Sequence, residues 1–370
     1  MNPIVSCRPN SRYDVETLTP LLEAIYDEAQ GPSIEGKTIL LKPNILFDEE
    51  PQRAVTTHPV FLEAVILFLQ SRGAEKIYVG DAPAIHGQDF KPRKSGILDV
   101  CERTGAEWTF FGKNVSSLKV KKRAIPIAEI VHRVDYIISL PKLKTHELMG
   151  YTGAIKNTFG LIPSLNKAAQ HAFHRSAKAM AAFLLDLNEA RTPDFFFMDA
   201  ILAMEGEGPG NGIPYALDVA LGSTNPLALD IVASKIIGYD PMQIETNRQG
   251  AARKKWLNIP EDIVFKGAKI EELIRDDFQL IEQVSMWKMS AGIVLRRIPF
   301  MRRFERRPFF IQKNCAGCRA CIEICPVSAL RMSEKEKNKV VIKDNKCIRC
   351  FCCHEVCKYD AIEIKKSFFG

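Results

Sequence analysis

Apolar positions in the first part of the chain alternate between two spacings. From Val15 to Ile25 they recur every three or four residues, which is typical of a helix, whereas residues 37–41 and 77–80 form short apolar runs typical of buried strands. Between these runs, Pro59–Arg72 has a proline at its start and a glycine just after its end, as helices favour. The order strand, helix, strand predicts two parallel strands joined by a right-handed crossover.

The same alternation continues further along the chain. Asp135–Leu140 and Asp194–Met198 are typical of strands, and Ser176–Arg191 and Pro226–Gly238 are typical of helices. We therefore expect the α/β fold class, with a large domain over residues 1–295 built on a mostly parallel sheet.

Polar residues follow four of the predicted strands, at the edge of the sheet where α/β proteins bind ligands. They are Lys42, Asn44, Asp81, Lys144, His146, Asp199 and Glu205. We predict that these residues line one ligand pocket. The alternative for His146 is a surface position on a basic loop, and exposed carboxylates such as Asp199 and Glu205 are common in any protein.

A glycine-rich turn follows His146. Gly150 and Gly153 precede Lys156, and the backbone N–H groups of such a turn can cradle an anion together with one positive charge. The alternative is a helix N-terminus with a solvated lysine. We take His146 and Lys156 as the candidate catalytic residues. The chain has no Walker signature, which argues against an ATP-binding loop.

Three further polar residues have two possible roles each. Asp230 lies in an apolar helix, where a charge needs a partner, so a pocket role and an ion-pair role both suit it. His171 and His174 are three residues apart and can share one face of a helix. They are either ligands or, as we expect, surface residues.

Eight cysteines near the C-terminus fall into two runs with the spacing C-x2-C-x2-C-x3-C. The runs are Cys315, Cys318, Cys321 and Cys325, then Cys347, Cys350, Cys353 and Cys357. This spacing resembles that of bacterial ferredoxins, which hold [4Fe–4S] clusters with it. Zinc sites usually offer separated C-x2-C pairs, and disulfides need an oxidising compartment. We therefore expect two [4Fe–4S] clusters in a small α+β, ferredoxin-like domain over residues 311–370.

In the bacterial arrangement the last cysteine of each run ligates the other cluster. The resemblance thus implies one cluster on Cys315, Cys318, Cys321 and Cys357, and a second on Cys347, Cys350, Cys353 and Cys325. Cys352 lies between two of these ligands and is expected to bind neither cluster. Matching segments after the two runs indicate an internal duplication, and residues 339–342 and 362–364 are typical of strands.

Composition limits the classes of partner. The formal charge of +7 counts every thiol as neutral, so a protein with two thiolate-bound clusters is less basic, and nucleic-acid binding is not favoured. No apolar run approaches the roughly 20 residues that span a bilayer, and Met1–Tyr13 lacks the pattern of a signal peptide. We expect a cytoplasmic location without a transmembrane segment.

Arginine and phenylalanine alternate over residues 296–310, between the two predicted domains. We predict an interdomain linker here. A membrane-surface contact and a docking site for an acidic electron carrier are the alternatives.

Five segments resemble the "domain of unknown function 362" (DUF362) family, which is often fused to ferredoxin modules. They are LKPNIL, GDAP, LPKLKTHELMGYTGAIKNTFGLIP, MDAILAMEGEGPG and NPLALDIVASKIIGYDP, within residues 35–270. The family is defined by sequence, and the resemblance implies no particular reaction.

A more distant resemblance is to the nickel-pincer lactate racemase family. His146 and the segment Gly150–Lys156 are similar to its H-x3-G-x-S-G-G-x-K motif, with Gly153-Ala154 in place of Gly-Gly, and His171 stands where that family has a further histidine. In that family these positions serve proton transfer, cofactor attachment and metal or substrate contact. The resemblance implies a shared fold and pocket position, and we do not extend it to the nickel cofactor.

Three functions follow from these features. The first is an iron–sulfur oxidoreductase that passes single electrons through two [4Fe–4S] clusters to or from an anionic organic ligand, such as a carboxylate or a flavin, with a redox partner such as a ferredoxin. The second is an electron-transfer adapter that docks to a partner enzyme. The third is a redox-silent, racemase-like isomerase, which predicts nickel or an adduct on Lys156.

The cysteine spacing makes a direct prediction about metal content. Protein prepared without oxygen should contain about eight iron atoms and about eight acid-labile sulfides per chain, because each [4Fe–4S] cluster holds four of each. Metal analysis and sulfide assay measure both. Zinc in place of iron would contradict the prediction.

Overall fold

The computed structural model describes residues 2–83, 90–174, 176–281, 306–334 and 339–365. Within these ranges the large domain is built on one sheet with the strand order β12-β1-β11-β10-β7-β2-β3-β4, while β8 pairs with β10 and β9. The strands are β1 Ile4–Pro9, β2 Thr38–Pro43, β3 Lys76–Asp81, β4 Glu107–Phe110, β7 Tyr136–Leu140, β8 Lys142–His146, β9 Gly150–Thr152, β10 Phe195–Glu205, β11 Ile213–Ser223 and β12 Val264–Gly267.

Most of the paired strands are parallel. β2 pairs in parallel with β3 and β7, and β10 pairs in parallel with β7 and β8, whereas β11 is antiparallel to β1 and β10. This confirms the expected fold class. The two strands β5 (Val115–Val120) and β6 (Arg123–Ala128) form a separate antiparallel pair.

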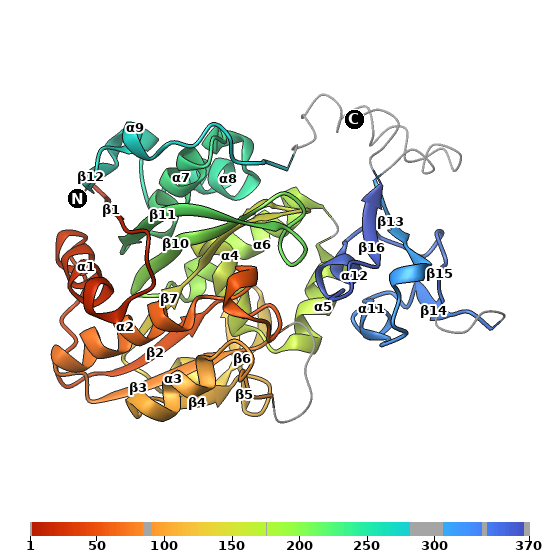
Figure 1. The fold of residues 1–370 in the computed structure, drawn as a ribbon, viewed down its shortest axis with the longest axis horizontal. Coiled ribbons are helices and arrows are strands. Elements are labelled where there is room, and N and C mark those ends of the chain that lie inside the picture. Colours follow the sequence, from red (N-terminus) through yellow and green to blue (C-terminus); the bar gives the residue numbers. More distant parts are fainter. Residues whose placement is uncertain (1, 84–89, 175, 282–305, 335–338, 366–370) are drawn as a thin grey trace.

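Helices cover both faces of the sheet (Figure 1). The helices of the large domain are α1 Val15–Glu28, α2 Pro59–Ser71, α3 Ile97–Thr104, α4 Ala154–Asn157, α5 Ser164–Phe173, α6 Ala177–Ala190, α7 Pro226–Ile236, α8 Glu245–Arg253 and α9 Ile270–Leu273. Along β10, Phe195 and Phe197 pack with α1 and α2, while Phe196 and Met198 pack with α6 and α7. A strand buried on both faces has apolar residues in succession, which explains this run of aromatic side chains.

The predicted elements agree with the structure, and one segment differs. Residues 142–146 were expected to leave the sheet after β7, but they form β8, because the chain bends at Pro141 and pairs again with β10. The N–H of Asp199 donates to Pro141 O at 2.9 Å at this bend. The carboxyl edge of the sheet is therefore extended by the short strand β8.

The C-terminal domain is a duplicated unit. β13 (Arg307–Phe310) pairs with β16 (Ile362–Lys365), and β14 (Leu330–Met332) pairs with β15 (Val340–Ile342), both antiparallel. Short helices, α11 (Ala320–Glu323) and α12 (Cys352–Glu355), occupy matching positions in the two cysteine runs. The strands expected at 339–342 and 362–364 correspond to β15 and β16.

The predicted linker overlaps this domain. β13 begins at Arg307, within the range 296–310, and forms the edge partner of β16. Residues 296–305 lie outside the described residues. Figure 1 shows the C-terminal domain beside α5, with α12 on the side that faces the large domain.

Candidate functional site

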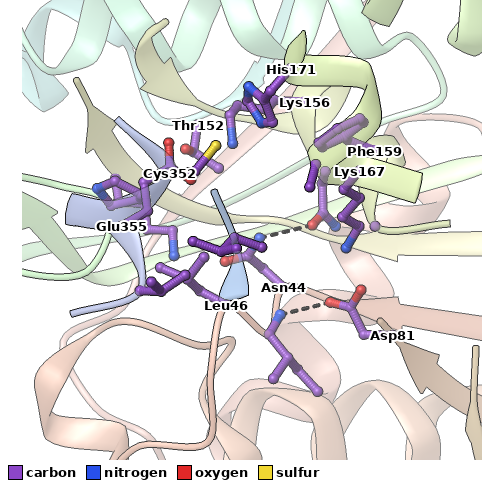
Figure 2. Close-up of a pocket in the computed structure, with 18 of the residues that line it drawn as sticks. Asn44, Leu46, Asp81, Thr152, Lys156, Phe159, Lys167, His171, Cys352 and Glu355 are labelled. Carbon is purple, nitrogen blue, oxygen red and sulfur yellow. Dashed lines mark hydrogen bonds between the residues drawn. The ribbon is translucent and has the colours of Figure 1, made fainter. Parts of the chain in front are cut away.

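A pocket lies between the large domain and the C-terminal domain (Figure 2). It encloses about 700 Å³, its open mouth included. Its lining residues from the large domain are Lys42, Asn44, Ile45, Leu46, Asp81, Lys144, Thr152, Lys156, Asn157, Phe159, Gly160, Lys167, Ala168, His171 and Pro209, and those from the C-terminal domain are Ile324, Cys352, Glu355 and Val356. The strand ends therefore supply one wall and the cysteine-rich domain supplies the other.

The structure brings together five of the residues predicted to form a pocket: Lys42, Asn44, Asp81, Lys144 and Lys156. His146 lies behind Glu355 and does not line the pocket. Gly150, Gly153, Asp199 and Glu205 also lie outside its lining. Glu205 Oε2 instead accepts a hydrogen bond from the N–H of Gln279 at 2.7 Å.

Lys42 and Asp81 form a buried ion pair at 3.0 Å. Lys42 Nζ also donates to Pro43 O at 2.6 Å and to Asn157 Oδ1 at 3.2 Å, so its three N–H groups all have acceptors. Burial lowers the pKa of Lys42, and the attraction of Asp81 opposes that shift. This pair fixes the floor of the pocket and leaves no donor for a ligand.

Three other lysines keep donors free. Lys144 Nζ donates to Val55 O at 2.6 Å, Lys167 Nζ donates to Ala82 O, and Lys156 Nζ has no hydrogen-bond or ion-pair partner among the described residues. Burial lowers the pKa of each, to about 8 for Lys167. Figure 2 shows Lys156 beside His171, with Lys167 across the pocket. An anion in the pocket would favour the charged forms of these lysines.

Unpartnered polar atoms gather at the same place. Asn44 Oδ1, Thr152 Oγ1 and His171 Nδ1 are buried and have no hydrogen-bond partner among the described residues. Buried polar atoms are normally satisfied, and several orphans in one pocket mark a place that a ligand or water fills. His171 is thus a pocket residue and not the surface residue that we expected.

His146 has its tautomer fixed by the backbone. Its Nδ1 accepts from the N–H groups of Leu148 and Met149, each at 3.2 Å, so the proton of the neutral ring is on Nε2. Nε2 lies 3.1 Å from Glu355 Oε1. Burial lowers the pKa of His146 to about 4, and nearby Lys156 adds to the shift.

Glu355 is the acid that sequence reasoning missed. Burial alone would raise its pKa, but the His146 contact and the positive charge of Lys156 outweigh burial and hold the pKa below its ordinary value. We therefore assign an ionised Glu355 and a neutral His146. Glu355 comes from α12, far along the chain from the strands that it faces, and only the duplication of the cysteine runs singled out its neighbourhood.

Asp230 positions the helix that carries Lys156. Its carboxylate accepts from the N–H of Ala154 at 2.6 Å, the N–H of Ile155 at 3.0 Å and the Tyr151 hydroxyl at 3.2 Å. Burial raises the pKa of Asp230 to about 7, and these hydrogen bonds oppose the shift. A Cβ on Gly153 would lie 2.1 Å from Asp230 Oδ1, so this glycine is needed for the close approach.

Asp199 belongs to a second buried network. Its oxygens accept from Lys142 Nζ at 2.8 Å, from the Tyr13 hydroxyl at 2.7 Å and from the N–H of His58 at 2.9 Å. Tyr13 stacks on His58 with ring centroids 3.5 Å apart. Both oxygens of this carboxylate accept hydrogen bonds within the protein, which gives Asp199 a structural place in the fold.

The cysteines of each proposed ligand set lie near one another, and the crossed assignment stays a prediction. A second cavity of about 340 Å³ is lined by Cys325, Cys347, Cys350 and Cys353, which are the four proposed ligands of the second cluster. Burial raises the pKa of Cys321 to about 12, and the neighbouring Cys318, Cys357 and Cys315 add to the shift. In both sets, therefore, the last cysteine of one run lies with the first three of the other.

Within the described residues, no three Cys, His, Asp or Glu side chains converge closely enough for a single metal ion. The fit to iron–sulfur clusters thus rests on which thiols share a cavity, and their number and type suit a cubane.

Cys352 forms part of both cavities. It lines the pocket together with Glu355, and it lines the cysteine cavity together with Cys350 and Cys353. A hydrogen bond with its thiol lowers the pKa of Cys350, a proposed cluster ligand. The pocket and the cavity of the proposed second cluster therefore share this residue in their linings.

The fold and the cysteine cavity define the class of this protein as an α/β protein that carries an iron–sulfur domain. Residues 39–235 match the family model described as "Domain of unknown function (DUF362)", and residues 314–361 match that of the "4Fe-4S dicluster domain". Because the first match covers more than half of the chain, the chain belongs to the DUF362 family.

A curated relative covers most of the chain. The "Thylakoid-associated protein sll1697" of Synechocystis sp. is 30% identical over 322 residues, which are 83% of this chain and 97% of the relative. No described helix is both long and apolar enough to cross a membrane.

Two solved structures are distant neighbours. A crystal structure of a Thermotoga maritima protein matches 54% of this chain and 52% of its own, with 15% identity and a TM-score of 0.34. The lactate racemase apoprotein of Thermoanaerobacterium thermosaccharolyticum matches 61% of this chain and 55% of its own, with 12% identity and a TM-score of 0.40. The matches span about half of each neighbour, and at these TM-scores we take no chemistry from either.

The Asp230 contacts predict a stability effect. Asp230→Ala would leave the N–H groups of Ala154 and Ile155 without acceptors, at about 1–3 kcal/mol each, so the thermal unfolding midpoint of the holo protein should fall by several degrees. Asp230→Asn keeps one acceptor oxygen and should lose less. Asp276→Ala, at an exposed position, is the control and should change stability by about 0.5 kcal/mol or less. An unchanged midpoint for Asp230→Ala, measured by circular dichroism, would contradict this role.

Proposed function

We propose that the protein is an iron–sulfur oxidoreductase that exchanges single electrons between two [4Fe–4S] clusters and an anionic organic ligand in the interdomain pocket. The observation that carries the proposal is the position of Cys352 in the wall of both cavities. When bound, the clusters supply one-electron transfer. The large domain supplies the ligand pocket, and its polar residues hold and orient the ligand.

The charges in the pocket favour an anion. Lys144, Lys156 and Lys167 have donors to spare, and the acid that faces them is Glu355, since Asp81 is bound to Lys42. When the three lysines are protonated, the local net charge is therefore about +2. A ligand with two negative charges, such as a phosphate monoester or a dicarboxylate, would balance them.

A phosphate-bearing flavin fits these requirements. Its phosphate supplies the anionic group, and a flavin can take up electrons one at a time. Among the candidate catalytic residues, Lys156 would contact the ligand directly. His146 would act through Glu355, because its Nε2 faces that carboxylate. We propose a redox protein such as a ferredoxin as the external partner. The cytoplasmic location stays a prediction, and the curated relative is described as thylakoid-associated.

The role of Lys156 is tested by ligand binding and electron transfer. We expect flavin mononucleotide to bind the anaerobic holo protein, and Lys156→Ala should weaken binding by about tenfold to a hundredfold, because a hydrogen bond to a charged group contributes about 1.5–3 kcal/mol. Lys235→Ala, an exposed position on α7, is the control. Calorimetry measures affinity, and the absorbance of reduced protein mixed with the flavin measures electron transfer.

The outcomes separate the candidate functions. Absence of any spectral change with flavins would rule out a flavin as the ligand. Intact electron transfer to a protein partner in both His146→Ala and Lys156→Ala would favour the adapter. Nickel, or an adduct on Lys156 detected by intact mass, would favour the isomerase.

Anion binding should depend on pH through Lys167. Its pKa is lowered to about 8 by burial; Asp81 opposes this shift, and Lys42 and Lys156 strengthen it. Above pH 8 the free protein loses this charge, so binding of an anion must then take up a proton. The affinity for sulfate, whose own charge is constant in this range, should fall by up to about tenfold from pH 7 to pH 9. Lys167→Gln should flatten the calorimetric profile, and an affinity that rises with pH would contradict the assignment.

A further inference from the structure

The two cysteine runs have the same local structure. The sequences align without gaps, residue by residue, over Cys315–Cys325 and Cys347–Cys357. In each run the residue before the helix has a left-handed backbone, Arg319 (φ 65°) in the first and Phe351 (φ 61°) in the second. Differences between equivalent positions therefore reflect what each run faces and not how it is folded.

Exposure differs sharply between equivalent positions. Arg319 is exposed whereas Phe351 is buried, and Glu323 is exposed whereas Glu355 is buried. Cys318 is exposed to solvent among the proposed ligands of the first cluster. The first run thus presents its loop to solvent, and the second run is covered by the large domain.

The pocket is built almost entirely on the second run. Cys352, Glu355 and Val356 line it, whereas the first run contributes only Ile324. Ala320 occupies the position of Cys352 in the first run, packs against the Ile324 and Val356 cluster, and does not line the pocket. The cavity of the proposed second cluster therefore shares a wall with the ligand pocket.

The exposed loop of the first run carries unpaired positive charge. Lys313 and Arg319 are exposed, and neither forms an ion pair with a described residue. Their equivalents in the second run are Asn345 and Phe351. No acidic residue lies between Lys313 and Ala320; Glu323 follows on α11. A solvent-facing cluster site flanked by cations matches a negatively charged protein surface.

We infer that the loop Lys313–Ala320 is the docking surface for an acidic one-electron carrier protein, and that the second run is dedicated to the pocket. The statement that the second run serves the pocket rests on the proposed function. The inference adds the docking surface of the carrier and the order in which the two clusters receive the electron. In each event the reduced carrier loses one electron and one iron of the first cluster gains it; no bond forms or breaks. The electron then passes to the second cluster, beside Cys352.

The test measures how fast a carrier reduces the clusters, with no pocket ligand present. The probe is a chemically reduced, acidic ferredoxin mixed with oxidised full-length holo protein in a stopped-flow instrument at low ionic strength. We expect the double variant Lys313→Glu, Arg319→Glu to lower the second-order rate constant about tenfold or more, because electrostatic steering is lost. Lys235→Glu makes the same kind of charge change on α7 and should leave the rate within about twofold.

Two further measurements guard against damage to the clusters. Excess dithionite should reduce the double variant to the same extent as the wild type, which establishes intact clusters. The wild-type rate should fall as salt rises from about 10 to 300 mM, since screening weakens attraction between opposite charges. A variant rate equal to that of the wild type, or a wild-type rate that does not fall with salt, would overturn the docking surface.

The failures are distinguishable. Loss of the docking surface leaves flavin binding and its dependence on Lys156 unaffected, whereas failure of the proposed function would appear as absent ligand binding with normal reduction by the carrier.

Discussion

Compensation of buried positive charge governs how the two domains meet. Placing a lysine inside a protein is costly unless an acid or a set of hydrogen bonds balances it. Lys42 and Lys142 have their own acids, Asp81 and Asp199, within the large domain. Lys144 and Lys156 form no ion pair among the described residues of that domain. Glu355 of the other domain attracts both, and Asp81 adds a weaker attraction on Lys144. The C-terminal domain therefore completes the electrostatics of the large one, beyond packing against it.

A second contact between the domains repeats this logic at the rim. Arg306, just before β13, pairs with Glu147, just after β8, and lies over the ring of Phe351. The acid is here on the large domain and the cation on the other. His146 faces Glu355 on α12 and Glu147 pairs with Arg306, so consecutive residues of one short segment contact the C-terminal domain at two places. This short segment, which lies within LPKLKTHELMGYTGAIKNTFGLIP, thus contacts the cysteine-rich domain at two points.

The sequence predicted the sheet and the cysteine sets because both depend on local pattern. Buried strands such as Thr38–Pro43 are apolar in succession, and four thiols around a cubane require fixed spacing. The pocket was only half predictable. Lys42, Asp81 and Lys156 follow strand ends or a turn, but Asp199, which has the same sequence context as Asp81, is closed off by Tyr13 from the start of the chain. No local pattern reports such a contact.

Glu355 was beyond sequence reasoning for a related reason. In the duplicated runs it is equivalent to Glu323, and one acid is exposed while the other is buried, so their difference exists only once the domains are docked. His171 and Lys167 likewise lie on α5, the helix beside the C-terminal domain (Figure 1). Tertiary contacts thus decide which residues line the pocket at positions where the local sequence is neutral.

The shared position of Glu355 also ties the pocket to the clusters energetically. An anion that binds Lys156 must share that lysine with Glu355, which lies on the same short helix as Cys353, a proposed cluster ligand. Any change that ligand binding makes in the surroundings of Glu355 is felt by the second cluster site. By linkage, the charge of that site must alter ligand affinity by the same free energy. If the proposed ligand and the second cluster both bind, the ligand affinity of the pocket would therefore depend on the redox state of that cluster.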